Sequence, residues 1–293
     1  MASRITSFMG FELAEPTYPG EESCMEERSV ADLDDLAKTS LATLYVRAKE
    51  TQSQNPIVRD PKAVEMVEKI GFDFREVARK FHKHDLICTA MRVRRFDEYV
   101  QDFLARFPNG VVVSIGCGLD DRFSRIDNGQ VIFYDLDFPG VIAMRRRFLT
   151  ESARNHCIPS SAQDFTWMNT LETLKPRPFL FIAEGVFQYF SEDEVKTLIE
   201  QLRSRFPGAE MAFDVCNTYM VKRMSHHSAL KETEASLRWG IKDSRDIEIL
   251  CPGVKFLDDW YYSDKWERKL GLFNLVLRVP FFKKMMWAVR YQL

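Results

Sequence analysis

The chain of 293 residues lacks an excess of positive charge, paired cysteines and long apolar runs. Its 41 Lys and Arg are offset by 43 Asp and Glu, and this formal net charge of −2 argues against nucleic-acid or anionic-membrane partners. The six cysteines include no CxxC pair and no His at zinc-finger spacing, so neither a disulfide framework nor a metal site is indicated. No apolar run approaches the ~18 residues of a membrane span.

These absences favour a chain that folds in a reducing compartment. The N-terminus shows no long apolar core followed by a small-residue cleavage site, so we expect a cytoplasmic protein rather than an exported one. Hydrophobic residues make up 45% and charged residues 29%, close to the average of globular proteins, which argues against disorder. The length predicts one large α/β domain, or a core with a cap, and nothing in the pattern specifies an oligomeric state.

The first third of the chain is predicted to be helical after a mobile N-terminal arm or lid. Residues 1–28 mix Gly, Pro and Ser with glutamates and offer little apolar surface to bury. Within 29–108, apolar residues recur every three or four positions over Ser29–Glu50, Pro61 opens a second helix, and Asp85–Phe107 forms a third. We expect these helices to flank a ligand site.

From residue 109 onward, strands alternate with helices, which predicts an α/β core with a mostly parallel sheet. The expected strands are Val111–Ile115, Val131–Tyr134, Phe179–Ala183, Met211–Val215 and Val254–Leu257, with helices at 139–149 and 191–206. The core is expected to cover 109–293, with a largely helical cap insertion around 217–250. The alternation Trp287, Val289, Tyr291, Leu293 predicts a terminal edge strand.

A glycine turn follows the first predicted strand. Gly116 and Gly118 permit a sharp turn and a close approach of the backbone to a nucleotide-like cofactor, although a simple strand-to-helix turn has the same spacing. In GCGLDD, Asp121 stands where a dinucleotide fingerprint has its third glycine. A carboxylate there repels pyrophosphate, which favours a cofactor without phosphates over NAD. Cys117 in this turn is expected to be a small buried thiol rather than a reactive one.

Carboxylates follow the next strands at the sheet edge where open α/β proteins bind ligands. Asp135 and Asp137 lie about where a carboxylate accepts hydrogen bonds from ribose hydroxyls, and Asp137 alternatively caps the helix that Pro139 begins. Glu184 ends the strand FLFIAE, where its charge would favour a neighbouring sulfonium.

A further carboxylate lies after the third strand region. Asp164 is placed to accept the exocyclic amine of an adenine, and Phe165 to cover its face. Taken singly, Asp164 is more often a turn residue.

Four motifs in order resemble the leucine carboxyl methyltransferase superfamily, and most of all its bacterial branch of tetracenomycin-type polyketide O-methyltransferases. They are VVVSIGCGLDDRFSRID, FYDLDFPGVIAMRRRFL, FIAEGVFQYFSEDEV and FPGAEMAFDV, preceded by MRVRRFDEYVQDFL. The resemblance covers roughly residues 30–293. It implies a class I S-adenosylmethionine-dependent methyltransferase with a Rossmann-like, mostly parallel seven-stranded sheet and a helical cap.

The resemblance also implies cofactor contacts at named positions. The family's arginine before the first strand, which grips the methionine carboxylate of S-adenosylmethionine, corresponds to Arg92. The family's turn glycine, ribose carboxylate, adenine-side pair and strand-end glutamate correspond to Gly116, Asp137, Asp164 with Phe165, and Glu184.

Methyl transfer from a sulfonium requires mainly positioning and the exclusion of water. We expect a small apolar acceptor that presents a carboxylate, which requires no base, or a phenol, which profits from a base such as His226 or His227. Tyr189, just past Glu184, is the first candidate for the acceptor pocket. Protein C-terminal carboxyl methylation, a NAD-type Rossmann oxidoreductase and a non-catalytic interaction protein stay open as alternatives.

Overall fold

The computed structural model describes residues 35–80, 82–225 and 237–293. The strands are β1 (Val111–Ile115), β2 (Ile132–Asp137), β3 (Asn155–Pro159), β4 (Phe179–Ala183), β5 (Glu210–Cys216), β6 (Lys255–Tyr261) and β7 (Met286–Gln292). The α-helices are α1 (Asp35–Thr51), α2 (Pro61–Lys69), α3 (Arg75–Lys80), α4 (Lys83–Arg106), α5 (Arg122–Ile126), α6 (Pro139–Arg146), α7 (Met168–Glu172), α8 (Glu192–Arg205), α9 (Thr218–Ser225), α10 (Asp246–Leu250), α11 (Phe273–Arg278) and α12 (Pro280–Lys283). Short 3-10 helices are η2 (Phe165–Trp167), η3 (Phe187–Tyr189) and η5 (Arg268–Leu270).

The described strands form one seven-stranded sheet in the order β3-β2-β1-β4-β5-β7-β6. Neighbouring strands from β3 to β5 are parallel, whereas β7 runs antiparallel to both β5 and β6. The parallel strands β1 and β4 are buried along their whole length, as expected when helices cover both faces. The predicted Rossmann-like, mostly parallel seven-stranded sheet is therefore confirmed.

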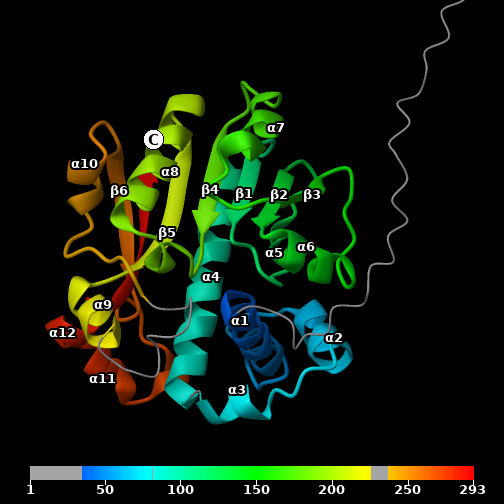
Figure 1. The fold of residues 1–293 in the computed structure, drawn as a ribbon. Coiled ribbons are helices and arrows are strands. Elements are labelled where there is room, and N and C mark those ends of the chain that lie inside the picture. The colour runs from blue at the N-terminus through cyan, green and yellow to red at the C-terminus, as the bar shows by residue number, and fades with distance from the viewer. Residues whose placement is uncertain (1–34, 81, 226–236) are drawn as a thin grey trace, which may run out of the picture.

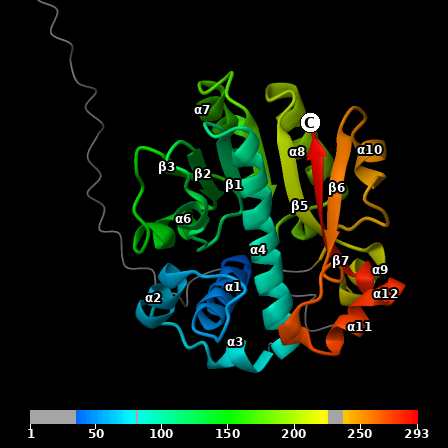
Figure 2. The ribbon, with the colours of Figure 1, turned by 180° about the vertical axis from the view of Figure 1, so that it is seen from behind.

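Helices cover both faces of the sheet (Figures 1 and 2). Residues of α7, α8 and α10 share a buried cluster with Val111, Val113 and Ile115 on one face, and residues of α4 share a second cluster with Val112 on the other. The side chains of β1 alternate between the two cores, as the two-residue period of a strand requires. Helix α8 begins with a capping box in which the Ser191 hydroxyl accepts from the Glu194 N–H, which fixes where the helix starts.

The N-terminal helices pack together at the carboxyl ends of the parallel strands, where α1 lies below β1 and β4 in Figure 1. Helix α2 starts at Pro61, as predicted, and the Asp60 side chain caps it by accepting from the Ala63 N–H. Leu41 and Leu44 of α1 are fully buried in a cluster with Leu119, the residue after the glycine turn. This packing holds α1 against the turn.

One sequence prediction needs correction. The terminal strand β7 is not an edge strand, because it pairs with β5 on one side and β6 on the other. The alternation of Trp287, Val289 and Tyr291 shows which residues face the core, and it carries no information on which strands lie beside them. The structure also contains α3, an additional helix before the first strand.

The cap predicted around 217–250 contains the helices α9 and α10 in its described part, while residues 237–245 are not helical. Residues 237–245 form turns and a bridge in which Ile241 N donates to Cys216 O at 3.0 Å. A Cβ on Gly240 would lie 2.4 Å from Cys216 O, so the backbone itself packs against the end of β5. Residues 226–236, like the predicted arm at 1–28, lie outside the described residues.

Candidate functional site

A cavity of about 200 Å³ lies at the carboxyl ends of β1, β2 and β4. Its wall includes the turn after β1, the end of β2 and the residues that follow β4. Helix α1 closes it with Ser40, Thr43 and Arg47, and α4 contributes Arg92. Ligands of open parallel sheets bind at this edge, so the cavity is the candidate site.

Glycines make the turn after β1 possible. Gly116 has φ +66° and Gly118 has φ +54°, conformations in which a side chain is strained. A Cβ on Gly116 would lie 2.5 Å from Val186 Cγ2 across the cavity wall. The Gly118 N–H donates to Asp137 Oδ2 at 2.7 Å, which ties the turn to the end of β2. The turn is therefore both narrow and fixed.

The two aspartates of β2 have different surroundings. Asp137 lines the cavity, and its Oδ1 accepts from the Phe138 N–H at 2.7 Å, while Phe138 rather than Asp137 is the N-cap of α6. Asp135 lies two residues before Asp137 in β2. It is 1% exposed, and its carboxylate pairs with Arg145 Nη2 at 2.5 Å. Asp135, which is buried and paired with Arg145, does not line the cavity, whereas Asp137 does.

Arg92 lies between two carboxylates. Its Nε donates to Glu184 Oε1 and its Nη1 to Asp214 Oδ2, each at 3.0 Å. Burial acts to lower the pKa of Arg92, but Asp214 and Glu184 more than offset it and raise that pKa. Asp214 Oδ1 also accepts from the Gly185 N–H at 2.6 Å, so Arg92 is aligned with the backbone that follows Glu184.

A buried ion network behind the turn was not predicted from the sequence. Asp120 lies 2.9 Å from Arg122 Nη2, 2.7 Å from Arg125 Nη1 and 3.4 Å from Arg47 Nε. Burial alone would raise the pKa of Asp120, yet these arginines hold it well below its usual range. The charge of Asp120 is thus balanced by three arginines.

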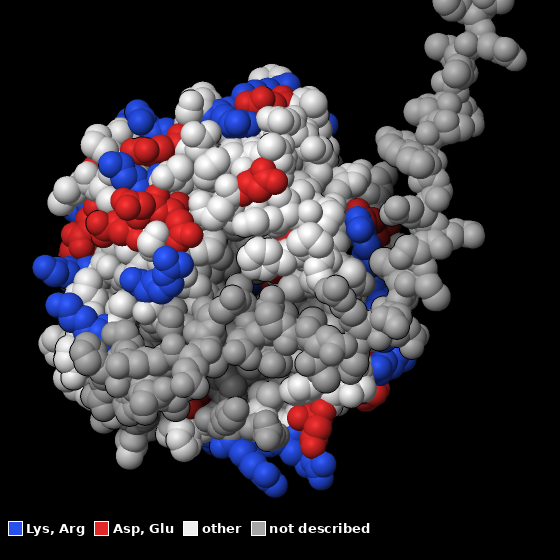
Figure 3. Space-filling view, in the orientation of Figure 1, with Lys and Arg blue, Asp and Glu red and all other residues white. Residues whose placement is uncertain are grey.

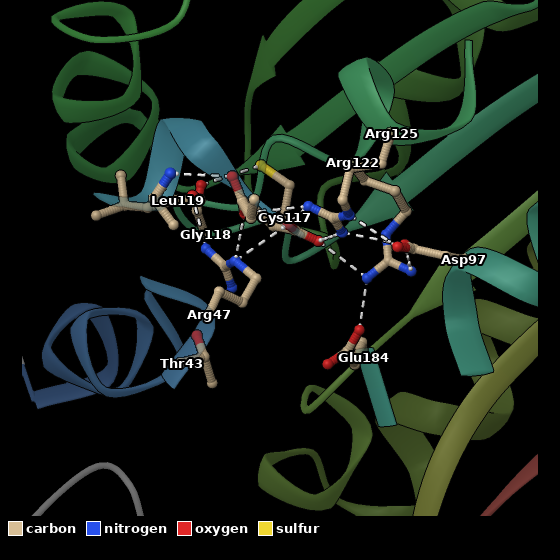
Figure 4. Close-up of polar contacts among 12 residues, drawn as sticks. Thr43, Arg47, Asp97, Cys117, Gly118, Leu119, Arg122, Arg125 and Glu184 are labelled. Carbon is tan, nitrogen blue, oxygen red and sulfur yellow. Dashed lines mark hydrogen bonds and ion pairs between the residues drawn. The ribbon is translucent and has the colours of Figure 1, made fainter. Parts of the chain in front are cut away.

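The same network reaches the cavity. Arg122 Nη2 donates to Glu184 Oε2 at 2.5 Å (Figure 4). Because Arg92 donates to Glu184 Oε1, arginines hold both oxygens of Glu184. Arg47 also donates to the Leu119 carbonyl at 2.8 Å, which joins α1 to the turn. The motif GLDDRFSR contains Arg122, Arg125 and their partner Asp120, whereas their further partners Asp97 and Glu184 lie elsewhere in the sequence.

Asp164 and Phe165 do not line the cavity wall, which at this side consists of Ser160–Ala162. Asp164 is exposed, and its Oδ1 accepts from the backbone N–H and the hydroxyl of Thr166 at the start of η2. That is the turn role expected of such a residue. Their contact with an adenine stays a prediction.

The acceptor-side predictions have mixed outcomes. Tyr189 lines the cavity, and burial raises its pKa. His226 and His227 lie outside the described residues. Cys117 is buried, and burial raises the pKa of its thiol well above the usual range, as expected of an unreactive cysteine.

Charge and hydropathy elsewhere give no second site. On the face in Figure 3, Lys and Arg side chains lie among Asp and Glu side chains. Among residues 35–80, 82–225 and 237–293, no helix combines the length and apolar composition of a membrane crossing. The same residues contain no cluster of three or more His, Cys, Asp or Glu that could hold a metal ion.

Comparison with known proteins identifies related sequences. A family model described as leucine carboxyl methyltransferase matches residues 40–203. The tetracenomycin polyketide synthesis O-methyltransferase TcmP of Streptomyces glaucescens is 30% identical over 78% of this chain and 83% of its own. The S-adenosyl-L-methionine-dependent methyltransferase dpfgK of Gibberella zeae is 26% identical over 79% of this chain and 84% of its own.

A solved structure shares the fold. A DUF574 family protein from Streptomyces avermitilis aligns with a TM-score of 0.54 and 11% identity, covering 87% of this chain and 96% of that one.

Proposed function

The chain belongs to the leucine carboxyl methyltransferase family, and from this premise we propose that it transfers a methyl group to an oxygen atom of a small apolar acceptor. It is an S-adenosylmethionine-dependent methyltransferase with the class I fold. The oxygen nucleophile and the polyketide-like acceptor, with a carboxylate or phenolic hydroxyl, are the proposal. The name of the relative TcmP, an O-methyltransferase of polyketide synthesis, supports both.

The cavity fits the cofactor at several points. Gly116 lines the cavity, and because it has no Cβ, Val186 packs directly against the turn that the cofactor would contact. We propose that Asp137 binds the ribose hydroxyls, because it ends β2 within the cavity wall. Arg92 is the cation on the wall nearest Gly185, and we propose that it holds the methionine carboxylate. The adenine end would then extend past Ser161 toward Asp164 and Phe165.

When bound, S-adenosylmethionine supplies an activated methyl group on a sulfonium. Glu184 is held in place by Arg92 and Arg122, so its charge is fixed beside the cavity. Tyr189 and Phe190 follow in the same wall, and α1 covers the cavity from the opposite side. We propose that these groups hold the acceptor oxygen in line and exclude water.

One observation carries the proposal. A single cavity joins the features suited to the cofactor, Gly116 and Asp137, to the aromatic residues Tyr189 and Phe190. Apolar and aromatic walls with a few placed polar groups are typical of small-molecule sites. Carboxyl methylation of a protein C-terminus remains the alternative within the family, whereas family membership argues against a NAD-type oxidoreductase.

Methyl transfer can be measured directly with S-adenosylmethionine labelled in its methyl group. The acceptors are aromatic carboxylic acids, phenols and a peptide that ends in Leu. We expect label in the aromatic compounds, and alkaline treatment separates methyl esters, which release methanol, from stable methyl ethers. Asp137→Ala is the cofactor-binding control. Label in the peptide alone would contradict the small-molecule proposal.

A further inference from the structure

The short helix η3 carries a buried carboxamide that the protein uses only in part. Gln188 is 6% exposed, although it lines the cavity. Its Oε1 has no hydrogen-bond partner among the described residues. An unpaired buried acceptor is unfavourable and calls for a partner. Because Gln188 lines a ligand cavity, the missing partner is expected to be a group that the cavity binds.

The backbone around Gln188 is fixed from outside the helix. Its carbonyl accepts from the N–H groups of Arg238 at 2.7 Å and Trp239 at 3.3 Å. Arg238 in turn lies 3.3 Å from Glu194 of α8. The preceding residue, Phe187, is fully buried. Rotation of η3 would break these contacts, so Gln188 is held toward the cavity.

The Gln188 side chain also acts on Tyr189, the next residue of the cavity wall. Burial raises the pKa of Tyr189, while a hydrogen bond from the Gln188 side chain acts in the opposite direction. A donor N–H has this effect on a phenol, because it stabilises the phenolate. The amide oxygen, which has no partner among the described residues, is the atom left for a ligand.

We propose that Gln188 Oε1 accepts a hydrogen bond from a hydroxyl group of the acceptor, so that the enzyme selects hydroxylated aromatic acceptors. This inference rests on the proposed function. The hydroxyl is a recognition group, and the oxygen that is methylated is a separate one. An aromatic acid without a hydroxyl offers no proton at this point and leaves Oε1 unpaired. Sites built to bind a substrate hydroxyl reject analogues that lack it.

The test compares two acceptors that differ by one group, a hydroxyanthraquinone carboxylic acid and the same acid without the hydroxyl. In the wild type we expect kcat/KM to favour the hydroxylated acid by roughly tenfold to a hundredfold, the range for a buried polar group left unpaired. Gln188→Leu should bring the two values within about threefold, mainly by raising KM for the hydroxylated acid.

Two variants separate recognition from folding. Gln188→Glu keeps an acceptor oxygen at this place and should retain the preference for the hydroxyl. Gln130→Leu changes an exposed glutamine and should leave both acceptors unaffected. Calorimetric titration with S-adenosylhomocysteine should give the wild-type affinity in Gln188→Leu.

Three results would overturn the proposal. The first is an unchanged preference in Gln188→Leu. The second is a weakened affinity for S-adenosylhomocysteine in that variant with an unchanged acceptor KM, which would assign the amide to the cofactor. The third is a wild type that methylates both acids equally. If no aromatic acceptor is methylated at all, the proposed function fails and this inference fails with it.

Discussion

The glycine at position 116 allows a quantitative prediction, because two separable effects oppose a side chain there. Gly116 has φ +66°, and an added Cβ would lie 2.5 Å from Val186 Cγ2. The left-handed backbone costs roughly 1–2 kcal/mol for an alanine. Forcing a methyl group into a packed wall costs roughly 1–3 kcal/mol more. We therefore expect Gly116→Ala to lose about 2–5 kcal/mol of unfolding free energy.

A matched control isolates the backbone effect. Gly129 has φ +82°, and a Cβ there would meet nothing within 4 Å. Gly129→Ala should therefore lose only the unfolding free energy that the left-handed backbone costs an alanine, about 1–2 kcal/mol. Combining Gly116→Ala with Val186→Ala removes the clash but not the strain. In the double-mutant cycle, the unfolding free energies of Gly116→Ala and Val186→Ala should show a favourable coupling of roughly 0.5–3 kcal/mol.

The assay is urea unfolding of the four variants and the wild type, followed by calorimetric titration with S-adenosylhomocysteine. Val186 lines the cavity, so a displaced Val186 should also weaken binding in Gly116→Ala, while Gly129→Ala should bind like the wild type. The reasoning is refuted if Gly116→Ala loses no more stability than Gly129→Ala, or if the cycle is additive.

Three further changes test the site. Arg92→Ala and Glu184→Ala should each weaken S-adenosylhomocysteine binding by roughly 1.5–3 kcal/mol, the range for charge-assisted hydrogen bonds, and unchanged affinity in both would show that the assigned contacts are wrong. Asp164→Ala should weaken S-adenosylhomocysteine binding, because Asp164 is proposed to bind the adenine amine. Wild-type affinity in this variant would show that Asp164 only forms the turn with Thr166. Cys117 should resist iodoacetamide at pH 8 in the folded protein, because burial raises the pKa of its thiol and keeps it protonated; rapid labelling seen by peptide mass spectrometry would contradict this.

Local patterns predicted the central strands well. The structure places β1 at Val111–Ile115 and β4 at Phe179–Ala183, the same bounds as the sequence pattern. Both are short apolar runs bounded by turn residues, so the run itself and the residues that flank it indicate the same strand. The positions of Gly116 and Asp137 followed, because the ends of neighbouring parallel strands meet at one edge.

Features that depend on distant partners were not predictable in this way. The Arg122–Glu184 pair joins residues 62 positions apart, and the Arg47–Leu119 bond joins residues 72 apart. Tertiary packing buries the side chains of Arg47 and Arg122, and no local pattern in the sequence indicates these partners. Likewise, Gln188 carries no periodic signal, and only its burial beside the cavity marks it.

The central claim is that the cavity at the carboxyl ends of β1, β2 and β4 holds S-adenosylmethionine. Calorimetric titration of the wild type and of Asp137→Ala with S-adenosylhomocysteine, and separately with NAD, tests it most directly. The account predicts micromolar binding of S-adenosylhomocysteine by the wild type, much weaker binding by Asp137→Ala, and no binding of NAD. Binding of NAD alone, or equal binding of S-adenosylhomocysteine by both proteins, would contradict the account.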